Sequence, residues 1–188
     1  TLFRSDNVSP KVQSVLEEYT QINSKIKLLP NPEPGNYAAG INAALSLAGG
    51  EFFGLLDVGD SLTRDALYQV TALLNRYPLA DAIYGDEDKR TASGDLAEPY
   101  FKPDWSPESL MSRMYVGRFC VYRRDLVAGE LMGLRTGFES ASEYDLLLRL
   151  SEKSDKIYHV PTVLYHRGIE VGTGRMPVLR EAGKKALE

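Results

Sequence analysis

The chain has 188 residues, of which 43% are hydrophobic and 26% are charged, and its formal net charge is -4. This length and composition are those of one folded domain with a substantial core. No apolar run approaches the roughly 20 residues that span a bilayer. The acidic balance gives no reason to expect nucleic-acid binding. The only cysteine, Cys120, stands in an apolar run and cannot form an internal disulfide, so we expect it to be packed in the core and the protein to be cytoplasmic.

The first quarter of the chain reads as two strands and two helices. Residues 1–4 are expected to form a strand, and Ser9 and Pro10 have the residue types of a helix N-cap and first helical position. Residues 26–29 form a second expected strand. A proline-rich loop follows, and then a helix rich in small residues over 36–48.

A short buried strand is expected within residues 50–62, where an apolar run leads into an acidic turn. Asp57 and Asp60 follow this run. In an open α/β sheet ligands bind at the carboxyl ends of the strands, where two carboxylates can hold a divalent cation. The alternative, which this stretch favours when it is taken alone, is that Asp60 and Ser61 cap the next helix.

The rest of the chain continues the alternation of strands and helices. The amphipathic stripe over 63–77 predicts a helix, residues 82–84 a strand, and 89–107 a long irregular segment of the kind that is often functional. The remaining expected elements are strands at 117–122, 157–160 and 163–165 and helices at 124–129 and 143–152.

This alternation predicts an α/β fold, with a mostly parallel (mixed) sheet covered by helices on both faces. We place one domain at residues 1–167, and a C-terminal tail or linker with weak helical character at residues 168–188.

Several segments in the same order resemble one family, the inverting glycosyltransferases of family 2 with the GT-A fold, especially the bacterial members that build O-antigen and other surface polysaccharides. The resemblance covers roughly residues 6–167 and rests on segments 50–60, 84–89, 101–107, 121–124, 143–149 and 159–166. An acidic pair after a strand is common, whereas six such segments in order are specific.

The family begins with a strand and turn that hold the nucleobase, and nothing before Thr1 supplies them. We therefore expect the chain to be a fragment of a longer protein that lacks the first strand of the fold. Part of the nucleotide pocket would then be missing from it.

The resemblance implies donor-binding residues. Asp6 matches a position that contacts the base or ribose, Asn42 one near the diphosphate, and Asp57 the first acid of the D-x-D motif. Asp86 and Asp88 match an acidic strand end near the donor sugar and the acceptor. As residues alone, the run 86–88 reads equally well as a solvated turn.

The resemblance also implies a Mg²⁺ or Mn²⁺ ion held by Asp57, Asp60 and His166, bridging phosphate oxygens of a nucleoside-diphosphate sugar. Gly59 stands where the second acid of the motif usually lies, so Asp60 would have to take its place. A lone histidine such as His166 is more often a structural residue than a ligand.

Glu143 matches the catalytic base, which takes the proton of the acceptor hydroxyl in a single displacement. Its alternative is a favourable interaction with the helix dipole, and its neighbour Asp145 is expected to form only a surface or local salt bridge with Arg149. Burial would raise the pKa of Glu143 and a nearby cation would lower it, and the sequence does not decide between them.

On the acceptor side, the positions of Tyr115 and Arg118 after the long loop favour acceptor contacts, whereas Trp105 is read first as a packing anchor and second as a sugar platform. The acceptor is expected to be a saccharide or a lipid-linked saccharide. The latter would place the protein at the inner face of the membrane, with peripheral contact only, and the basic pair at 184–185 is the sole local sign of it.

Two other functions remain open. Gly59 and the missing strand favour a non-catalytic binding or scaffolding module that kept the fold. A nucleotidyltransferase that makes the sugar nucleotide is the third reading, and it would need a glycine-rich basic loop near its start that is not visible here.

Overall fold

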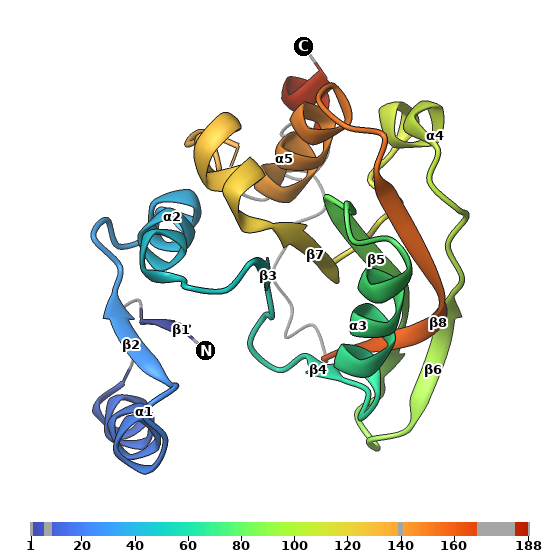
Figure 1. The fold of residues 1–188 in the computed structure, drawn as a ribbon. Helices are drawn as coiled ribbons and strands as arrows, with labels where there is room; N and C mark the ends of the chain where they lie inside the picture. Colours follow the sequence, from blue (N-terminus) through green and yellow to red (C-terminus); the bar gives the residue numbers. More distant parts are fainter. Residues whose placement is uncertain (1, 6–8, 139–140, 169–182, 188) are drawn as a thin grey trace.

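The computed structural model describes residues 2–5, 9–138, 141–168 and 183–187, and only the backbone of 2–5. Strands and helices alternate along these residues, as the sequence predicts (Figure 1). The elements are β1 (Leu2–Ser5), α1 (Pro10–Ile22), β2 (Lys27–Pro30), α2 (Tyr37–Leu47), β3 (Phe52–Gly54), β4 (Ser61–Leu62), α3 (Ala66–Arg76), β5 (Ala82–Arg90), β6 (Leu96–Tyr100), α4 (Pro107–Ser112), β7 (Cys120–Arg123), the π-helix η1 (Leu126–Glu130), α5 (Ser142–Ser151) and β8 (Ile157–Arg167).

The described strands form two sheets. β1 and β2 pair in parallel, and the larger sheet has the order β3-β7-β5-β8-β4, with β6 paired to β5. The expected mixed sheet is confirmed, but it is less parallel than expected: β5 and β8 run in parallel, whereas the β3–β7, β5–β7, β5–β6 and β4–β8 pairs are antiparallel. The reason lies in the segment after β5, which turns back through β6 and α4 in place of a helical crossover.

The sheet is covered on both faces because side chains alternate along its central strands. Ala82 and Tyr84 of β5 pack in one cluster with the buried leucines of α5, whereas Ile83 packs in the other with Val70 of α3. The two clusters lie on opposite faces, with α5 and α2 on one side and α3 on the other (Figure 1). This confirms the expected arrangement of layers.

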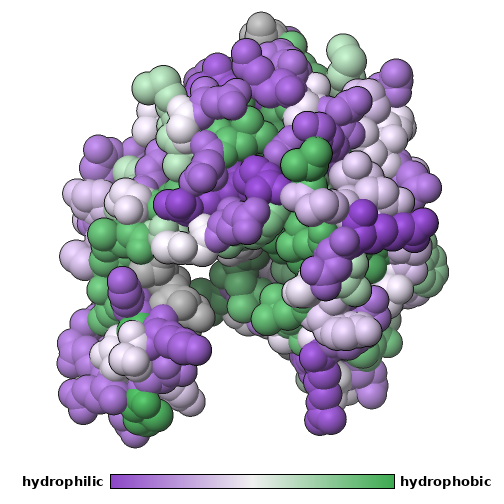
Figure 2. All heavy atoms as spheres, viewed as in Figure 1, coloured by the Kyte–Doolittle hydropathy of each residue, from purple (hydrophilic) through white to green (hydrophobic). Residues whose placement is uncertain are grey.

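The N-terminal unit formed by β1, α1, β2 and α2 stands beside this body. Ser9 caps α1 and Pro10 occupies its first turn, as predicted. None of the described residues of α1 is fully buried, and its apolar face is open: Val12 is 46%, Tyr19 55% and Ile22 72% exposed. Figure 2 shows a hollow between this unit and the main body, with apolar side chains in its wall.

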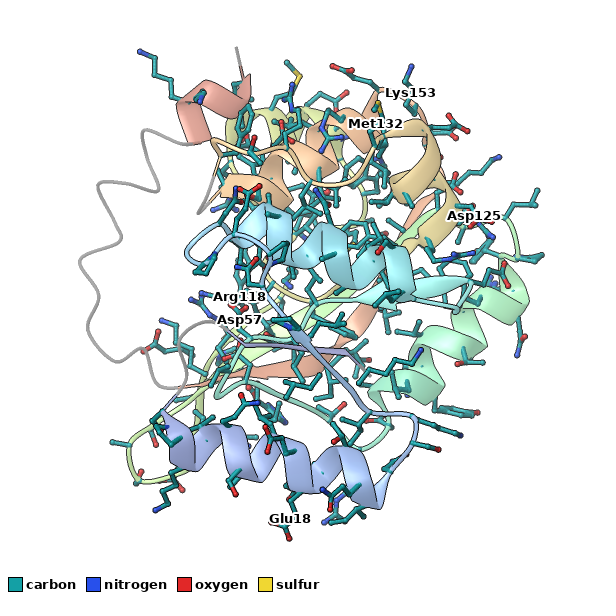
Figure 3. The ribbon with its side chains drawn as sticks, turned by 90° about the vertical axis from the view of Figure 1, so that its left-hand side faces the viewer. Glu18, Asp57, Arg118, Asp125, Met132 and Lys153 are labelled. Atoms are coloured by element: carbon teal, nitrogen blue, oxygen red, sulfur yellow. The ribbon has the colours of Figure 1, made fainter. Side chains whose placement is uncertain are left out.

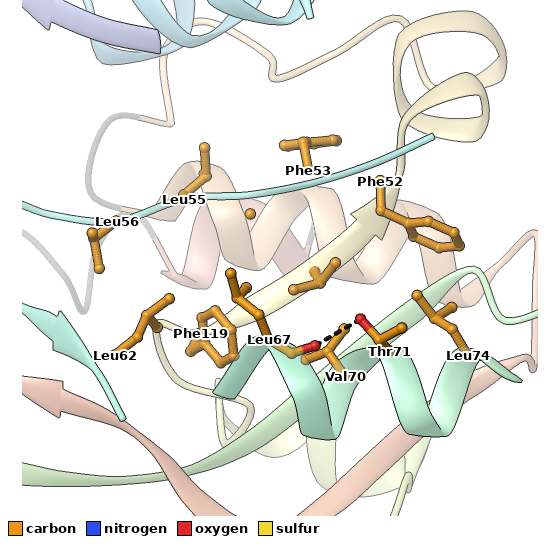
Figure 4. A pocket seen from close by; sticks show the side chains of 12 residues that line it. Phe52, Phe53, Leu55, Leu56, Leu62, Leu67, Val70, Thr71, Leu74 and Phe119 are labelled. Atoms are coloured by element: carbon orange, nitrogen blue, oxygen red, sulfur yellow. Dashed lines mark hydrogen bonds between the residues drawn. The ribbon is translucent and has the colours of Figure 1, made fainter. Parts of the chain in front are cut away.

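An apolar groove of about 470 Å³ lies between β3 and α3. Its walls include Phe52, Leu67, Val70 and Phe119, and its only side-chain hydrogen bond drawn in Figure 4 is that from Thr71 Oγ1 back to Leu67 O, which stays within the helix. The residues that line the groove carry no charge, and two of them, Leu56 and Phe119, are the chain neighbours of Asp57 and Arg118 in the polar site described below.

Some elements differ from the expectation. The helix expected from residue 63 begins at Ala66, because residues 61–62 form β4 against β8. The two last expected strands are one strand, β8, with an irregular register opposite Gly85 and Asp86. Within the predicted tail, residues 183–187 are helical, and Lys185 Nζ donates to Gly137 O at 2.8 Å.

Candidate functional site

The acidic run of β5 is not a solvated turn. Asp86, Glu87 and Asp88 continue the strand and are 2%, 4% and 7% exposed. Burying a carboxylate is costly unless it is paired and hydrogen-bonded, and each of these three has a basic partner. The partners lie far along the chain, which is why the local pattern does not reveal them.

Glu87 is paired with Lys102, which is also buried. Lys102 Nζ lies 3.0 Å from Glu87 Oε2 and donates to Gly85 O at 2.6 Å, and the backbone N–H of Lys102 donates to Asp86 Oδ1 at 2.9 Å. Burial lowers the pKa of Lys102, while the charge of Glu87 acts in the opposite direction. This buried pair holds the residues that follow β6 against β5, and the sequence did not single out Lys102.

The two histidines hold the other acids of β5. His159 Nε2 lies 2.8 Å from Asp86 Oδ1, and its ring stacks on Tyr84 with centroids 4.9 Å apart. His166 Nδ1 lies 2.6 Å from Asp88 Oδ1, directly across the β5–β8 ladder. Asp86 and Asp88 are therefore engaged inside the protein, where the resemblance implied donor contacts.

Asp57 and Arg118 form an ion pair between Asp57 Oδ2 and Arg118 Nη1. Asp57 follows β3 and Arg118 precedes β7, the two strands that pair at this side of the sheet. Both side chains are partly open, with 38% of Asp57 and 34% of Arg118 exposed, and they lie side by side in Figure 3. The predicted acceptor residue Arg118 thus meets the predicted donor residue Asp57.

The backbone that carries Arg118 is fixed by Glu87. The N–H of Arg118 donates to Glu87 Oε2 at 3.2 Å, and Gly117 precedes it with φ +73°. A Cβ on Gly117 would lie 2.9 Å from Glu87 Cδ and 2.9 Å from Lys102 Nζ. Only glycine fits this turn, so the buried Glu87–Lys102 pair determines where Arg118 begins.

The acidic turn after β3 closes with a hydrogen bond from Asp60 N to Asp57 O at 3.2 Å, and Gly59 has φ +90°. A positive φ at the third residue of a turn favours glycine. Asp60 does not cap the next helix, so that interpretation was wrong. Its carboxylate instead accepts from Tyr165 OH and from Gly168 N–H, the latter at 2.6 Å, which ties the turn to β8.

The three predicted metal ligands are therefore not gathered into one set. Asp57 pairs with Arg118, Asp60 with Tyr165 and Gly168, and His166 with Asp88. Among the residues that the structure describes, no group of three or more His, Cys, Asp or Glu side chains is placed to hold a metal ion. The side chains present do not fit the Mg²⁺ or Mn²⁺ site that the resemblance implied.

Glu143 lies in the first turn of α5, as predicted, and is half-buried. Tyr37 OH of α2 donates to Glu143 Oε1 at 3.2 Å. Burial raises the pKa of Glu143 to about 7, although the Tyr37 hydrogen bond and the charge of Arg118 both lower it. Desolvation thus outweighs the Tyr37 hydrogen bond and the charge of Arg118. Tyr37 itself was not predicted as a site residue.

The neighbouring Asp145 is not part of a surface salt bridge. It is fully buried, and its carboxylate is paired with Arg149 at 2.9 Å and with Arg135. Arg149 also donates to Leu131 O at 2.7 Å and Gly133 O at 2.9 Å. The i, i+4 pair is therefore a structural tie between α5 and the segment after η1.

The remaining predicted residues have other surroundings. Tyr115 is fully buried, and its OH accepts from Ser106 N–H at 2.9 Å, so its ring cannot reach an acceptor in this structure. Trp105 packs against the same core with its ring centroid 6.4 Å from that of Tyr115, which agrees with the packing interpretation. Asn42 donates to Leu134 O and accepts from Leu134 N–H, both at 2.8 Å, so both ends of its amide hold the backbone. Asp6 lies outside the described residues.

The described part of the site thus brings Asp57, Arg118 and Glu143 to one side of the molecule. Arg118 links them, because it pairs with Asp57 and its charge acts on Glu143. Figure 2 shows hydrophilic side chains gathered on one face above the hollow. Among the described helices, none is both long enough and apolar enough to cross a bilayer.

The comparisons of this chain with known proteins agree on one family. The model of glycosyl transferase family 2 matches residues 2–129. The O-antigen biosynthesis protein RfbC of Myxococcus xanthus is 38% identical over 160 residues, which cover 85% of this chain and 12% of that protein. The chondroitin synthase of Pasteurella multocida is 27% identical, over 87% of this chain and 17% of that protein. The chain therefore spans only a small part of these curated relatives.

Solved structures share the fold at low sequence identity. A structure of S. aureus TarS in complex with UDP-GlcNAc has a TM-score of 0.78 at 14% identity, covering 98% of this chain and 55% of that one. The mannosyltransferase PcManGT of Pyrobaculum calidifontis, in complex with GDP-Man and Mn²⁺, has a TM-score of 0.68 at 16% identity, covering 95% and 50%. The match of the family model over residues 2–129, together with this shared fold, shows that the chain belongs to glycosyl transferase family 2 and has the GT-A fold.

Proposed function

We propose that this chain is the core of an enzyme that transfers a sugar, with inversion, from a nucleoside-diphosphate sugar to a saccharide or lipid-linked acceptor in polysaccharide biosynthesis. The observation that carries the proposal is Glu143, a half-buried carboxylate with a pKa of about 7 on the same side as Asp57 and Arg118. A general base works best when its pKa lies near the working pH. The donors named with the solved neighbours, UDP-GlcNAc and GDP-Man, support this class of donor.

The proposed chemistry is a single displacement. The acceptor hydroxyl oxygen attacks the anomeric carbon, and the bond from that carbon to the diphosphate oxygen breaks. The leaving nucleoside diphosphate keeps the electron pair, and the hydroxyl proton passes to the carboxylate of Glu143. Attack from the face opposite the leaving group inverts the anomeric centre. Tyr37 orients the Glu143 carboxylate through its 3.2 Å hydrogen bond.

The donor is proposed to lie over the turn that follows β3. Asp57 in this turn matches the acid that contacts the ribose in the family. The hydrogen bond from Tyr165 OH to the Asp60 carboxylate fixes the turn that carries Asp57. A lipid-linked acceptor would bring the protein to the inner face of the membrane as a peripheral protein. No step is assigned to a divalent cation, because Asp57, Asp60 and His166 are separately engaged.

The proposal is tested by measuring nucleoside-diphosphate release from a panel of UDP-, GDP- and dTDP-sugars. The full-length natural protein would be used, with oligosaccharide acceptors. We expect release with at least one donor, loss of release in Glu143→Gln, and retention in Glu152→Gln, which changes an exposed acid at the end of the same helix. NMR of the product should show the anomeric configuration opposite to that of the donor.

Two results would contradict the proposal. In the first, the protein binds the donor but releases no nucleoside diphosphate with any acceptor, and wild type and Glu143→Gln bind the donor equally. This result would support the non-catalytic binding module. A product with retained anomeric configuration would exclude the single displacement.

A further inference from the structure

We propose that Arg118 supplies the positive charge that neutralises the donor diphosphate, so that donor binding by this protein does not require a divalent cation. The inference rests on the proposed function and adds to it the group that holds the phosphates.

The first observation is that the three predicted metal ligands each contact a different partner within the protein. Asp60 is bound on both oxygens, Oδ2 by Tyr165 OH and Oδ1 by Gly168 N–H at 2.6 Å. His166 uses Nδ1 on Asp88 at 2.6 Å. A divalent cation needs such ligands gathered at one point, and among the described residues no group of three or more His, Cys, Asp or Glu side chains is placed to hold one.

The second observation is the glycine in the turn. Gly59 supplies no oxygen from its side chain at the position where the motif usually has its second acid, and its φ of +90° suits the turn that positions Asp57 and Asp60. Mg²⁺ and Mn²⁺ are held by several oxygen or nitrogen ligands in a defined geometry. Asp57 alone, already paired with Arg118, is a poor basis for such a site.

The third observation is that Arg118 brings a positive charge to the side of the sheet where Asp57 lies. It contacts Asp57 through Nη1, and its charge acts on Glu143 and on Tyr165. Its backbone is held by Glu87 and by the Gly117 turn, so the base of the side chain has a fixed position. The Arg118 side chain is 34% exposed, so a ligand can reach it.

Two other cations lie beside Glu87. The Lys102 side chain is fully buried and committed to Glu87 and Gly85 O, and Arg167, 24% exposed, has its Nη1 3.7 Å from Glu87 Oε1. A guanidinium group has five N–H donors in a planar fork and binds phosphate oxygens in a bidentate way. The ion pair with Asp57 occupies Nη1 and orients the fork. Asp57 is thus a positioning residue for Arg118 in addition to its place on the donor side.

The test is calorimetric titration of UDP, GDP and dTDP into the full-length natural protein, in EDTA and again in MnCl₂. We expect at least one nucleotide to bind the wild type with the same affinity, within about twofold, under both conditions. Arg118→Gln should lower that affinity by at least about tenfold, without rescue by Mn²⁺, and Arg118→Lys should retain part of it. Arg113→Gln, which changes an exposed arginine five residues earlier, is the matched control.

The outcomes separate the two proposals. Binding that is lost in EDTA and restored by Mn²⁺, or wild-type affinity in Arg118→Gln, overturns this inference and leaves the proposed function standing. Absence of nucleotide binding under every condition overturns both. A titration of Mn²⁺ into the nucleotide-free protein gives an independent readout, for which we expect no saturable binding. The EDTA comparison on the wild type tests the cation requirement even if a variant fails to fold, and Arg118→Lys, which keeps the charge, tests the role of Arg118 if Arg118→Gln does not fold.

Discussion

Glu143 combines the position of a base with a pKa suited to one. It begins α5, accepts from Tyr37 and faces the charge of Arg118, yet burial keeps its pKa at about 7. A carboxylate in water would ionise more than two pH units lower and would be a weaker base. The same burial has consequences for both rate and stability.

For the rate, we expect kcat of the wild type to rise with pH and to level off above about pH 7, because only the ionised carboxylate accepts the proton. Glu143→Gln should lower kcat by about 100- to 10,000-fold while the nucleotide affinity changes little. Steady-state rates over a pH series would show this. A wild-type profile that stays flat between pH 5 and 9 would exclude Glu143 as the base.

For stability, the sign follows from the raised pKa. The folded protein favours the protonated carboxyl, so its contribution to stability is complete below the ordinary value of 4.5 and is lost as the pH rises through about 7. Glu143→Gln should therefore be more stable than the wild type above pH 7, by at most about 3 kcal/mol, and equal to it near pH 4.5. Thermal melts of both proteins across this range test the sign. Glu152→Gln should show no such pH-dependent difference in stability from the wild type.

The turn before β7 shows how one element positions a side chain for another. Gly117 has φ +73° and leaves no room for a Cβ beside Glu87 and Lys102. We expect Gly117→Ala to combine backbone strain with displacement of a buried ion pair and to lower stability by about 3 kcal/mol or more. Gly94→Ala is the matched control, because Gly94 has φ +92° but nothing within 4 Å of an added Cβ, and it should cost about 1 kcal/mol.

Urea unfolding of the two variants measures this difference. Nucleotide affinity measured in parallel should fall in Gly117→Ala, since Arg118 would move with the turn, and should not change in Gly94→Ala. Equal losses of stability in both variants would show that the space beside Glu87 is not the controlling factor.

At the level of the whole molecule, stability should be uneven. α1 exposes its apolar face, whereas α5 has Leu146, Leu147 and Leu150 fully buried. We expect the amide protons of α1 to exchange with deuterium at least about tenfold faster than those of α5. Hydrogen exchange followed by mass spectrometry tests this on peptides from the two helices. Equal protection would mean that another surface covers α1 in solution.

Much of the architecture could be read from the sequence because it depends on local patterns. The Ser9-Pro10 start of α1, the span of α5 and the apolar strands follow from spacing and capping rules that hold within a few residues. β4 could not be predicted in this way, because a strand of two residues is too short to show a periodic pattern. Its pairing with β8 exists only in the folded sheet.

Apart from β4, β6 and α4, the sequence thus determined the elements, together with the α/β class and, through six ordered segments, the family, since these depend on residue type and short-range spacing. The family resemblance also led to the proposal that Glu143 is the base. The partners of the charged groups were decided by the tertiary structure: Lys102 for Glu87, His166 for Asp88, and Arg118 for Asp57. Each pair joins residues between 15 and 78 positions apart. A charge buried by folding is stable only beside its partner, and the chain topology alone brings the two together.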